Sequence, residues 1–189
     1  MKTNCFKAIC ALLGMLLSFG CTAARAQKTK PDLEEMKKQI ELFETVLNQS
    51  LTQAFSGPYD TLEKGRGAYL PGYGAVFTFE VSLTPLHILG PFSPAPAPKS
   101  EEAQRQQEAL RREKAKAVAQ QVLTNFGQTL RQLSAGESIA IVIYTVAAHP
   151  GKVARSTIVV AAEKSLLDQR QNNAIDPEGF ARKLSTTEY

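Results

Sequence analysis

The first periodic stretch of the chain runs from residue 33 to residue 55. Its hydrophobic side chains recur every three or four positions, which places them on one face of an α-helix. Asp32 and Glu35 have the spacing of an acidic capping box at the start of this helix. The pattern predicts an amphipathic helix that ends before Gly57-Pro58 and buries Leu33, Met36, Ile40, Phe43, Leu47 and Leu51.

Hydrophobic and polar residues alternate between residues 75 and 83, as in a strand with one buried face. The alternation puts Glu80 on the face opposite Phe77 and Phe79, so we expect Glu80 to be solvated. The glycine-rich segment before it, residues 61–74, predicts turns and at most a short strand.

A second long helix is predicted from Ser100 to about Leu133, with Glu101 and Glu102 at its positive end. Its first half is almost entirely polar, and charges of both signs alternate there. Its second half carries hydrophobic residues at helical spacing. We therefore expect only the second half to pack on a core. The polar half either projects into solvent, bends near Gly127 or meets a partner.

Two β-branched runs, residues 139–148 and 155–162, predict an antiparallel hairpin. The first run is apolar on both faces, which is typical of a central strand. A short helix is predicted from Ser165 to about Gln171, and Asp176-Pro177 caps another. The tail, residues 185–189, is polar apart from its last ring.

This order of elements predicts an α+β fold of two layers, in which a mostly antiparallel sheet of 3–5 strands has two long helices packed on one face. We expect residues 27–189 to form a single domain with a Pro-rich loop at 85–99. The run Pro94-Ala-Pro-Ala-Pro98 favours an extended polyproline conformation in this loop.

Residues 1–26 have the three parts of a secretory signal peptide. Lys2 and Lys7 precede an apolar run over residues 9–19, and small residues end at Ala24-Arg25-Ala26. Cleavage after Ala26 predicts an exported protein, periplasmic or extracellular. The alternative is a bacterial lipoprotein anchored through Cys21. No later stretch approaches the roughly 20 apolar residues of a transmembrane span.

Removal of this leader changes the chemistry available to the mature chain. Cys5, Cys10 and Cys21 all leave, which excludes disulfides, thiolate metal sites and cysteine nucleophiles. Loss of Lys2, Lys7 and Arg25 leaves 19 basic residues against 18 acidic ones, a net charge of +1 instead of +4. The basic excess therefore gives no support to a nucleic-acid partner.

Few residues point to catalysis, a metal or a cofactor. The Gly72-Tyr73-Gly74 sequence leads into a strand, so it lacks the helix N-terminus that a nucleotide-phosphate loop uses. His87 and His149 are the whole histidine inventory and lack zinc-site spacing. We expect no catalytic residue, metal or cofactor. An enzyme would have Glu80 or His149 as its general base.

Exposed rings and loop residues are the candidates for binding. Tyr69 and Tyr73 flank Pro71, and aromatic side chains supply contact area at low entropic cost. Ile88, Leu89 and Phe92 lie in the Pro-rich loop, where extended segments favour docking to a protein partner. The polar half of the second helix is the other candidate surface for a protein.

Two short segments carry a resemblance: Gly72-Tyr-Gly74-x-Val76-Phe77, and the closing Phe180-x-x-Lys183-x-x-x-Thr187-Glu188-Tyr189. Together they are similar to an uncharacterised family of exported bacterial proteins with no known activity. We therefore expect an exported, non-enzymatic binding or assembly module of unknown partner. The alternatives are a small periplasmic enzyme of hydrolase type and a self-associating structural protein.

Overall fold

The structure is a computed structural model that describes residues 31–57, 60–84, 100–149 and 151–189. The predicted leader, residues 1–26, and the Pro-rich loop, residues 85–99, lie outside the described residues. The elements in chain order are α2 (Leu33–Ala54), β1 (Thr61–Leu70), β2 (Gly74–Ser82), α3 (Glu101–Phe126), the 3-10 turn η1 (Gly127–Thr129), β3 (Ser138–His149), β4 (Lys152–Glu163), α4 (Lys164–Gln171), α5 (Pro177–Lys183) and β5 (Ser185–Glu188).

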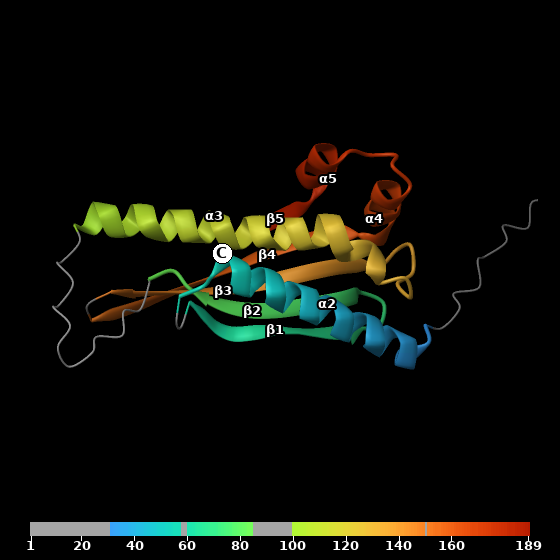
Figure 1. The fold of residues 1–189 in the computed structure, drawn as a ribbon, viewed down its shortest axis with the longest axis horizontal. Helices are drawn as coiled ribbons and strands as arrows, with labels where there is room; N and C mark the ends of the chain where they lie inside the picture. Colours follow the sequence, from blue (N-terminus) through green and yellow to red (C-terminus); the bar gives the residue numbers. More distant parts are fainter. Residues whose placement is uncertain (1–30, 58–59, 85–99, 150) are drawn as a thin grey trace, which may run out of the picture. The chain divides into compact units, whose positions relative to one another are not determined.

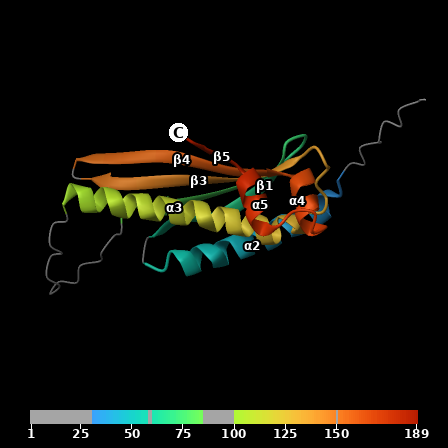
Figure 2. The ribbon, with the colours of Figure 1, turned by 90° about the horizontal axis from the view of Figure 1, so that it is seen from above.

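The five strands form one sheet in the order β1-β2-β3-β4-β5. Neighbouring strands are antiparallel except β2 and β3, which are parallel and are connected through α3. The described helices all lie on one side of this sheet (Figure 2). α2 contacts β1, α3 contacts β3 and β4, and the two long helices contact each other (Figure 1). The predicted two-layer α+β fold is therefore confirmed.

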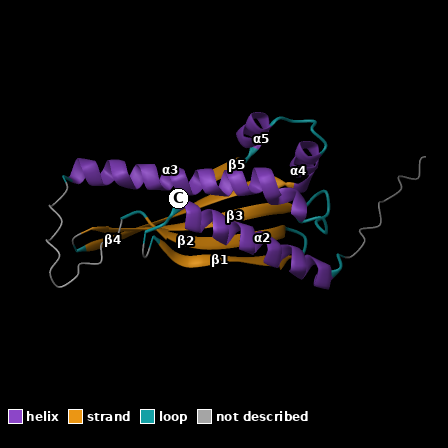
Figure 3. Cartoon of the chain, viewed as in Figure 1, coloured by secondary structure: helices purple, strands orange, loops and turns teal. Residues whose placement is uncertain are grey.

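The hydrophobic core fills the space between the sheet and the two long helices. Phe43 of α2 and Phe77 of β2 are fully buried, and their ring centroids are 4.2 Å apart. The apolar stripe of α2 and the inward positions of β2, β3 and β4 supply most of the remaining core. Figure 3 shows the two layers as purple helices over orange strands. Within the described residues, no helix is long and apolar enough to cross a bilayer.

The glycine-rich segment is a ten-residue edge strand, β1, and not a set of turns with a short strand. Its glycines are required by close packing. A Cβ on Gly65 would lie 2.8 Å from Leu47, and one on Gly67 would lie 2.4 Å from the ring of Phe77. α2 also closes part of the strand edge, because Asn48 accepts from the Gly65 amide and donates to its carbonyl oxygen.

The second long helix ends earlier than the sequence predicts. α3 stops at Phe126, and the 3-10 turn η1 replaces the last turns that were expected to reach Leu133. Gly127 begins this turn at a close approach to α4, where a Cβ would lie 2.5 Å from the side chain of Leu167. Leu130 and Leu133 nevertheless remain buried, so their hydrophobic spacing reflects packing and not a continuous helix.

The polar tail is not a free end, because Ser185–Glu188 forms the fifth strand, β5. It pairs with β4, and Tyr189 exchanges two backbone hydrogen bonds with Thr157, of 2.8 and 3.0 Å. All four residues of β5 are exposed, which explains why no hydrophobic alternation indicates a strand here. The two short helices α4 and α5 lie where the sequence predicts them.

Candidate functional site

The polar half of α3 is held on the sheet by ion pairs along its length. The Arg111 Nη2 atom lies 2.7 Å from Asp60 Oδ1, and Arg111 Nε donates to the carbonyl oxygen of Ser82 at 2.9 Å. The same guanidinium lies over the ring of Phe55. The core residues of α3 lie in its second half, as predicted, but the expectation of an exposed polar half was wrong. A search for periodic hydrophobic residues cannot detect a helix segment that is held in place by charged side chains.

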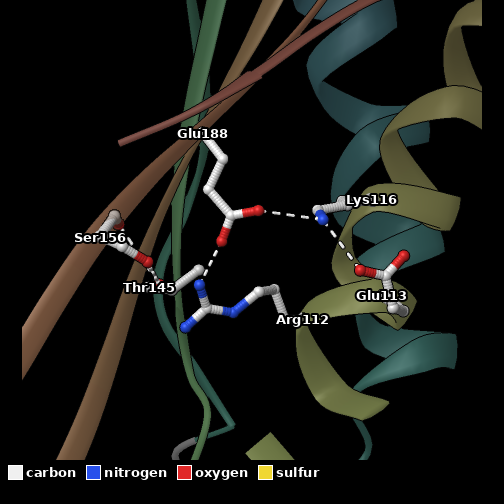
Figure 4. A network of polar contacts seen from close by, with 6 residues as sticks. All are labelled: Arg112, Glu113, Lys116, Thr145, Ser156 and Glu188. Atoms are coloured by element: carbon white, nitrogen blue, oxygen red, sulfur yellow. Dashed lines mark hydrogen bonds and ion pairs between the residues drawn. The ribbon is translucent and has the colours of Figure 1, made fainter. Parts of the chain in front are cut away.

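From the next residue of α3 onward, a charge cluster joins the helix to β5. The Glu188 carboxylate receives Arg112 and Lys116, the latter at 3.0 Å, and Lys116 also contacts Glu113 at 2.8 Å. Figure 4 shows both cations pointing toward Glu188. Beside this cluster, the hydroxyls of Thr145 and Ser156 are hydrogen-bonded to each other at 2.7 Å. The cluster ties the last strand to the helix layer.

The cluster shifts the pKa values of Glu188 and Lys116 in the direction that keeps both groups charged. Burial by itself raises the pKa of Glu188, but hydrogen bonds from Arg112 and Lys116 and their positive charges outweigh it, so the pKa is lowered. The hydrogen bond to Glu113 raises the pKa of Lys116 against its own desolvation, and Glu188 adds to this effect. These shifts are typical of an ion-pair network that fixes structure.

The two tyrosines singled out in the sequence have different surroundings. The Tyr69 hydroxyl donates to Oε1 of the buried Glu137 at 2.9 Å, and Glu137 Oε2 accepts from the Ser134 amide. Burial, and then this hydrogen bond, raise the pKa of Tyr69. Tyr73 lies in the β1–β2 turn and is 46% exposed. The loop candidates Ile88, Leu89 and Phe92 lie outside the described residues.

Glu80 and His149 lie on opposite faces of the sheet and do not form one site. His149 belongs to the helix-facing positions of β3, and its Nε2 is 3.5 Å from Glu108 of α3. Glu80 belongs to the outward positions of β2, next to Tyr144 in the strand register. A catalytic arrangement that uses both groups is therefore excluded by strand alternation.

Glu80 lines a hollow of about 350 Å³ on the side of the sheet away from the helices. Tyr144, Arg155, Thr157 and Tyr189 also line it. Glu80, Tyr144 and Thr157 are successive neighbours across β2, β3 and β4, and Tyr189 pairs with Thr157. Within the described residues, no ion pair or hydrogen bond is formed by the Glu80 or Arg155 side chain. In the part of the chain that the structure describes, the hollow thus presents an unpaired carboxylate and an unpaired guanidinium beside two phenol rings.

The hollow is part of a larger surface, which we call the outer face. It consists of the outward positions of the three central strands, and none of the described helices covers it (Figure 2). The outward positions of β3 carry no charged residue, although Tyr144 among them is 46% exposed. The outer face comprises Val76, Thr78, Glu80, Ser82, Ala140, Val142, Tyr144, Val146, Ala148, Val153, Arg155, Thr157, Val159 and Ala161.

Sequence reasoning named Glu80 but missed the groups that converge on it. Tyr144, Arg155 and Tyr189 come from strands far along the chain, and only the parallel pairing of β2 with β3 brings them to Glu80. The signal that was present is the uncharged outward row of β3, which the sequence pattern already marked as apolar on both faces.

A larger groove, of about 730 Å³, runs between α2 and β1 but offers less free chemistry. Asn48 is committed to the Gly65 backbone, and the hydroxyls of Thr45 and Thr52 donate to carbonyls of their own helix. Among the described residues, no group of three or more metal-ligating side chains is present. The chain matches no protein-family model, no curated protein and no solved structure.

Proposed function

We propose that the protein is an exported, non-enzymatic binding or assembly module that acts through the outer face of its sheet. The observation that carries the proposal is the uncharged, uncovered row of β3, which contains Val142, Tyr144 and Val146. An antiparallel sheet that faces water normally alternates hydrophobic-in and polar-out positions. A central strand with apolar side chains on both faces is instead typical of a sheet that is covered on both sides.

The residues around this row support binding of a macromolecule. Glu80 and Arg155 lie on either side of β3 without an intramolecular partner among the described residues. An apolar centre flanked by charged groups is the usual anatomy of a protein–protein interface. Tyrosine and arginine are also the residue types that most often dominate binding energy at such interfaces.

Site-specific crosslinking in cells that export the full chain tests this proposal. A photo-crosslinking amino acid at Val142 is expected to yield covalent adducts with a protein, whereas the same group at Lys38 is not. Lys38 is the matched control because it is exposed on α2, in the opposite layer. Equal adduct yields from the two positions, or none from Val142, would contradict binding through the outer face.

Export is tested by the mass of the protein recovered from the periplasm or the medium. Cleavage after Ala26 predicts a chain that begins at Gln27. A lipid-modified chain that begins at Cys21 would support the anchored alternative. An unprocessed leader on protein from the cytosol would contradict export.

The hollow favours a second candidate function, that of a small hydrolase-type enzyme with Glu80 as general base. The supporting observation is that Tyr144, Arg155 and Thr157 line the same hollow as the free Glu80 carboxylate. Hydrolysis of 4-nitrophenyl acetate by the wild type and by Glu80→Gln tests it. This candidate predicts turnover that the substitution abolishes, and identical rates for the two proteins would refute it.

A further inference from the structure

We infer that the partner on the outer face is a second copy of this chain, packed face to face about a two-fold axis that runs along β3. This inference rests on the proposed function, because it names the occupant of the same surface. A two-fold interface places one surface patch against the identical patch, so that patch must be complementary to itself. The outer face meets this requirement in both its charges and its apolar row.

The charges are complementary because they lie on opposite sides of the proposed axis. Rotation about β3 keeps each residue at its level along the strands and places β2 of one copy over β4 of the other. Glu80 then faces Thr157 of the partner, because both are aligned with Tyr144 in the strand register. Arg155 of the partner is two residues further along β4, about 7 Å away along the strand. A long arginine side chain spans that distance, and the symmetry forms the pair twice.

The apolar residues match under the same rotation. The outward row of β3 packs on its own copy, which brings Val142, Tyr144 and Val146 to the centre of the interface. Val76 of β2 is level with Ala161 of β4, so these two side chains meet across the interface. Two sheets packed in this aligned way lie about 10 Å apart.

The side of the sheet that carries the outer face is large enough for a stable dimer. β2 and β3 are paired from Gly74↔Ser138 to Ser82↔Val146, which at about 3.4 Å per residue gives a length of roughly 30 Å. Together with the flanking edge strands β1 and β5, the outer face belongs to a sheet of five strands, which at a spacing of about 4.8 Å is roughly 24 Å wide. The resulting area, roughly 700 Å² per copy, is close to the about 800 Å² that each partner buries in a standard interface.

The sheet edges are less suited to self-association. At the β1 edge, backbone groups of Gly65 and Gly67 are already bonded to Asn48 and Glu44 of α2. The opposite edge strand, β5, is only four residues long. Side-chain caps and short edge strands are devices that prevent edge-to-edge pairing. Association through the face is therefore better supported than association through an edge.

Sedimentation of charge-reversal variants of the exported protein tests the inference. The wild type is expected to be a dimer with a dissociation constant in the micromolar range or below. Glu80→Arg and Arg155→Glu are each expected to raise that constant by about tenfold or more, because like charges then meet twice. The double variant restores opposite charges and is expected to return it to within about threefold of the wild type. Lys38→Glu, on the opposite layer, is the charge-change control.

Val142→Lys adds an independent test at the centre of the face, where two lysines would meet across the axis. It is expected to give a monomer that still unfolds in one cooperative transition in urea. A monomeric wild type overturns the inference, as does a dimer insensitive to Val142→Lys or a double variant that stays dissociated. If the wild type is a monomer and still crosslinks to another protein through position 142, self-association is refuted and the proposed function stands. If the wild type is a monomer and forms no adduct at position 142, both self-association and the proposed function are refuted.

Discussion

Replacement of Arg111 by methionine is the sharpest test of how the polar half of α3 is held. The side chains of Arg111 and Asp60 are 15% and 10% exposed, so their ion pair is largely shielded from water. Methionine keeps much of the aliphatic length that packs beside Phe55 but removes the charge. Asp60 would then be a buried carboxylate without its cation, and the Ser82 carbonyl would lose a donor.

The expected loss of stability follows from the burial of this pair. Removal of one partner of a buried ion pair costs about 3–5 kcal/mol, because the remaining charge stays desolvated. The Gly57 amide still donates to Asp60 Oδ2 at 3.1 Å, which favours the lower end of that range. A loss of about 3 kcal/mol is a large part of the about 5–15 kcal/mol that stabilises a typical domain. It corresponds to a fall in melting temperature of about 6–12 °C for a domain of this size.

Urea unfolding of Arg111→Met, with Lys114→Met as the control, measures this loss. Lys114 lies over the same Phe55 ring, 5.6 Å from its centroid, but it is exposed and no carboxylate pairs with it among the described residues. The control is therefore expected to lose less than about 1 kcal/mol. A loss below about 1 kcal/mol for Arg111→Met, the range of a surface pair, would refute the conclusion that this pair anchors the helix.

Two further predictions concern the turn before β2 and the last strand. Gly74→Ala is expected to destabilise the fold by more than about 2 kcal/mol in urea unfolding. Gly74 has a φ of +128°, and a Cβ there would lie 1.9 Å from the Ser138 carbonyl oxygen. Gly72→Ala, with a φ of +84° and open space around it, is expected to lose only about 1 kcal/mol, and equal losses would contradict this. The lowered pKa of Glu188 predicts that its stabilising effect is complete above the ordinary carboxyl pKa of 4.5 and is lost as the pH falls through the folded-state value. The stability difference between the wild type and Glu188→Gln should therefore shrink from pH 6 toward about pH 3, and a constant difference would show that the ion pairs with Arg112 contribute nothing.

The elements that the sequence predicts well are those whose own burial pattern has a clear period. α2 follows its apolar stripe from Met36 to Leu51, and β2 follows its alternation through Phe77 and Phe79. β1 is missed because Gly67 is set by the bulk of the Phe77 ring opposite it, which is a tertiary requirement. β5 is missed because all of its residues are exposed, so they show no hydrophobic pattern. Its position is fixed by backbone hydrogen bonds to β4.

The candidate site is less accessible to sequence reasoning than the fold. Glu80 is recognisable by its place in an alternating strand, but its neighbours depend on the sheet order. Arg155 and Tyr189 approach it only because β3 inserts between β2 and β4 after the crossover through α3. Single-sequence patterns fix which face a residue occupies, whereas the residues beside it on that face follow from register.

The distribution of charge over the sheet is the pattern that the proposed interface on the outer face requires. Its formal charges are on the strands that flank β3, with Glu80 on β2 and Arg155 on β4. If the whole outer face were exposed to solvent, the outward positions of the central strand would be expected to be polar as well. The sequence pattern predicts a β3 that is buried on both faces, and the helices cover only one of them. The proposed partner on the second face would account for both observations, since an interface combines an apolar centre with a polar rim.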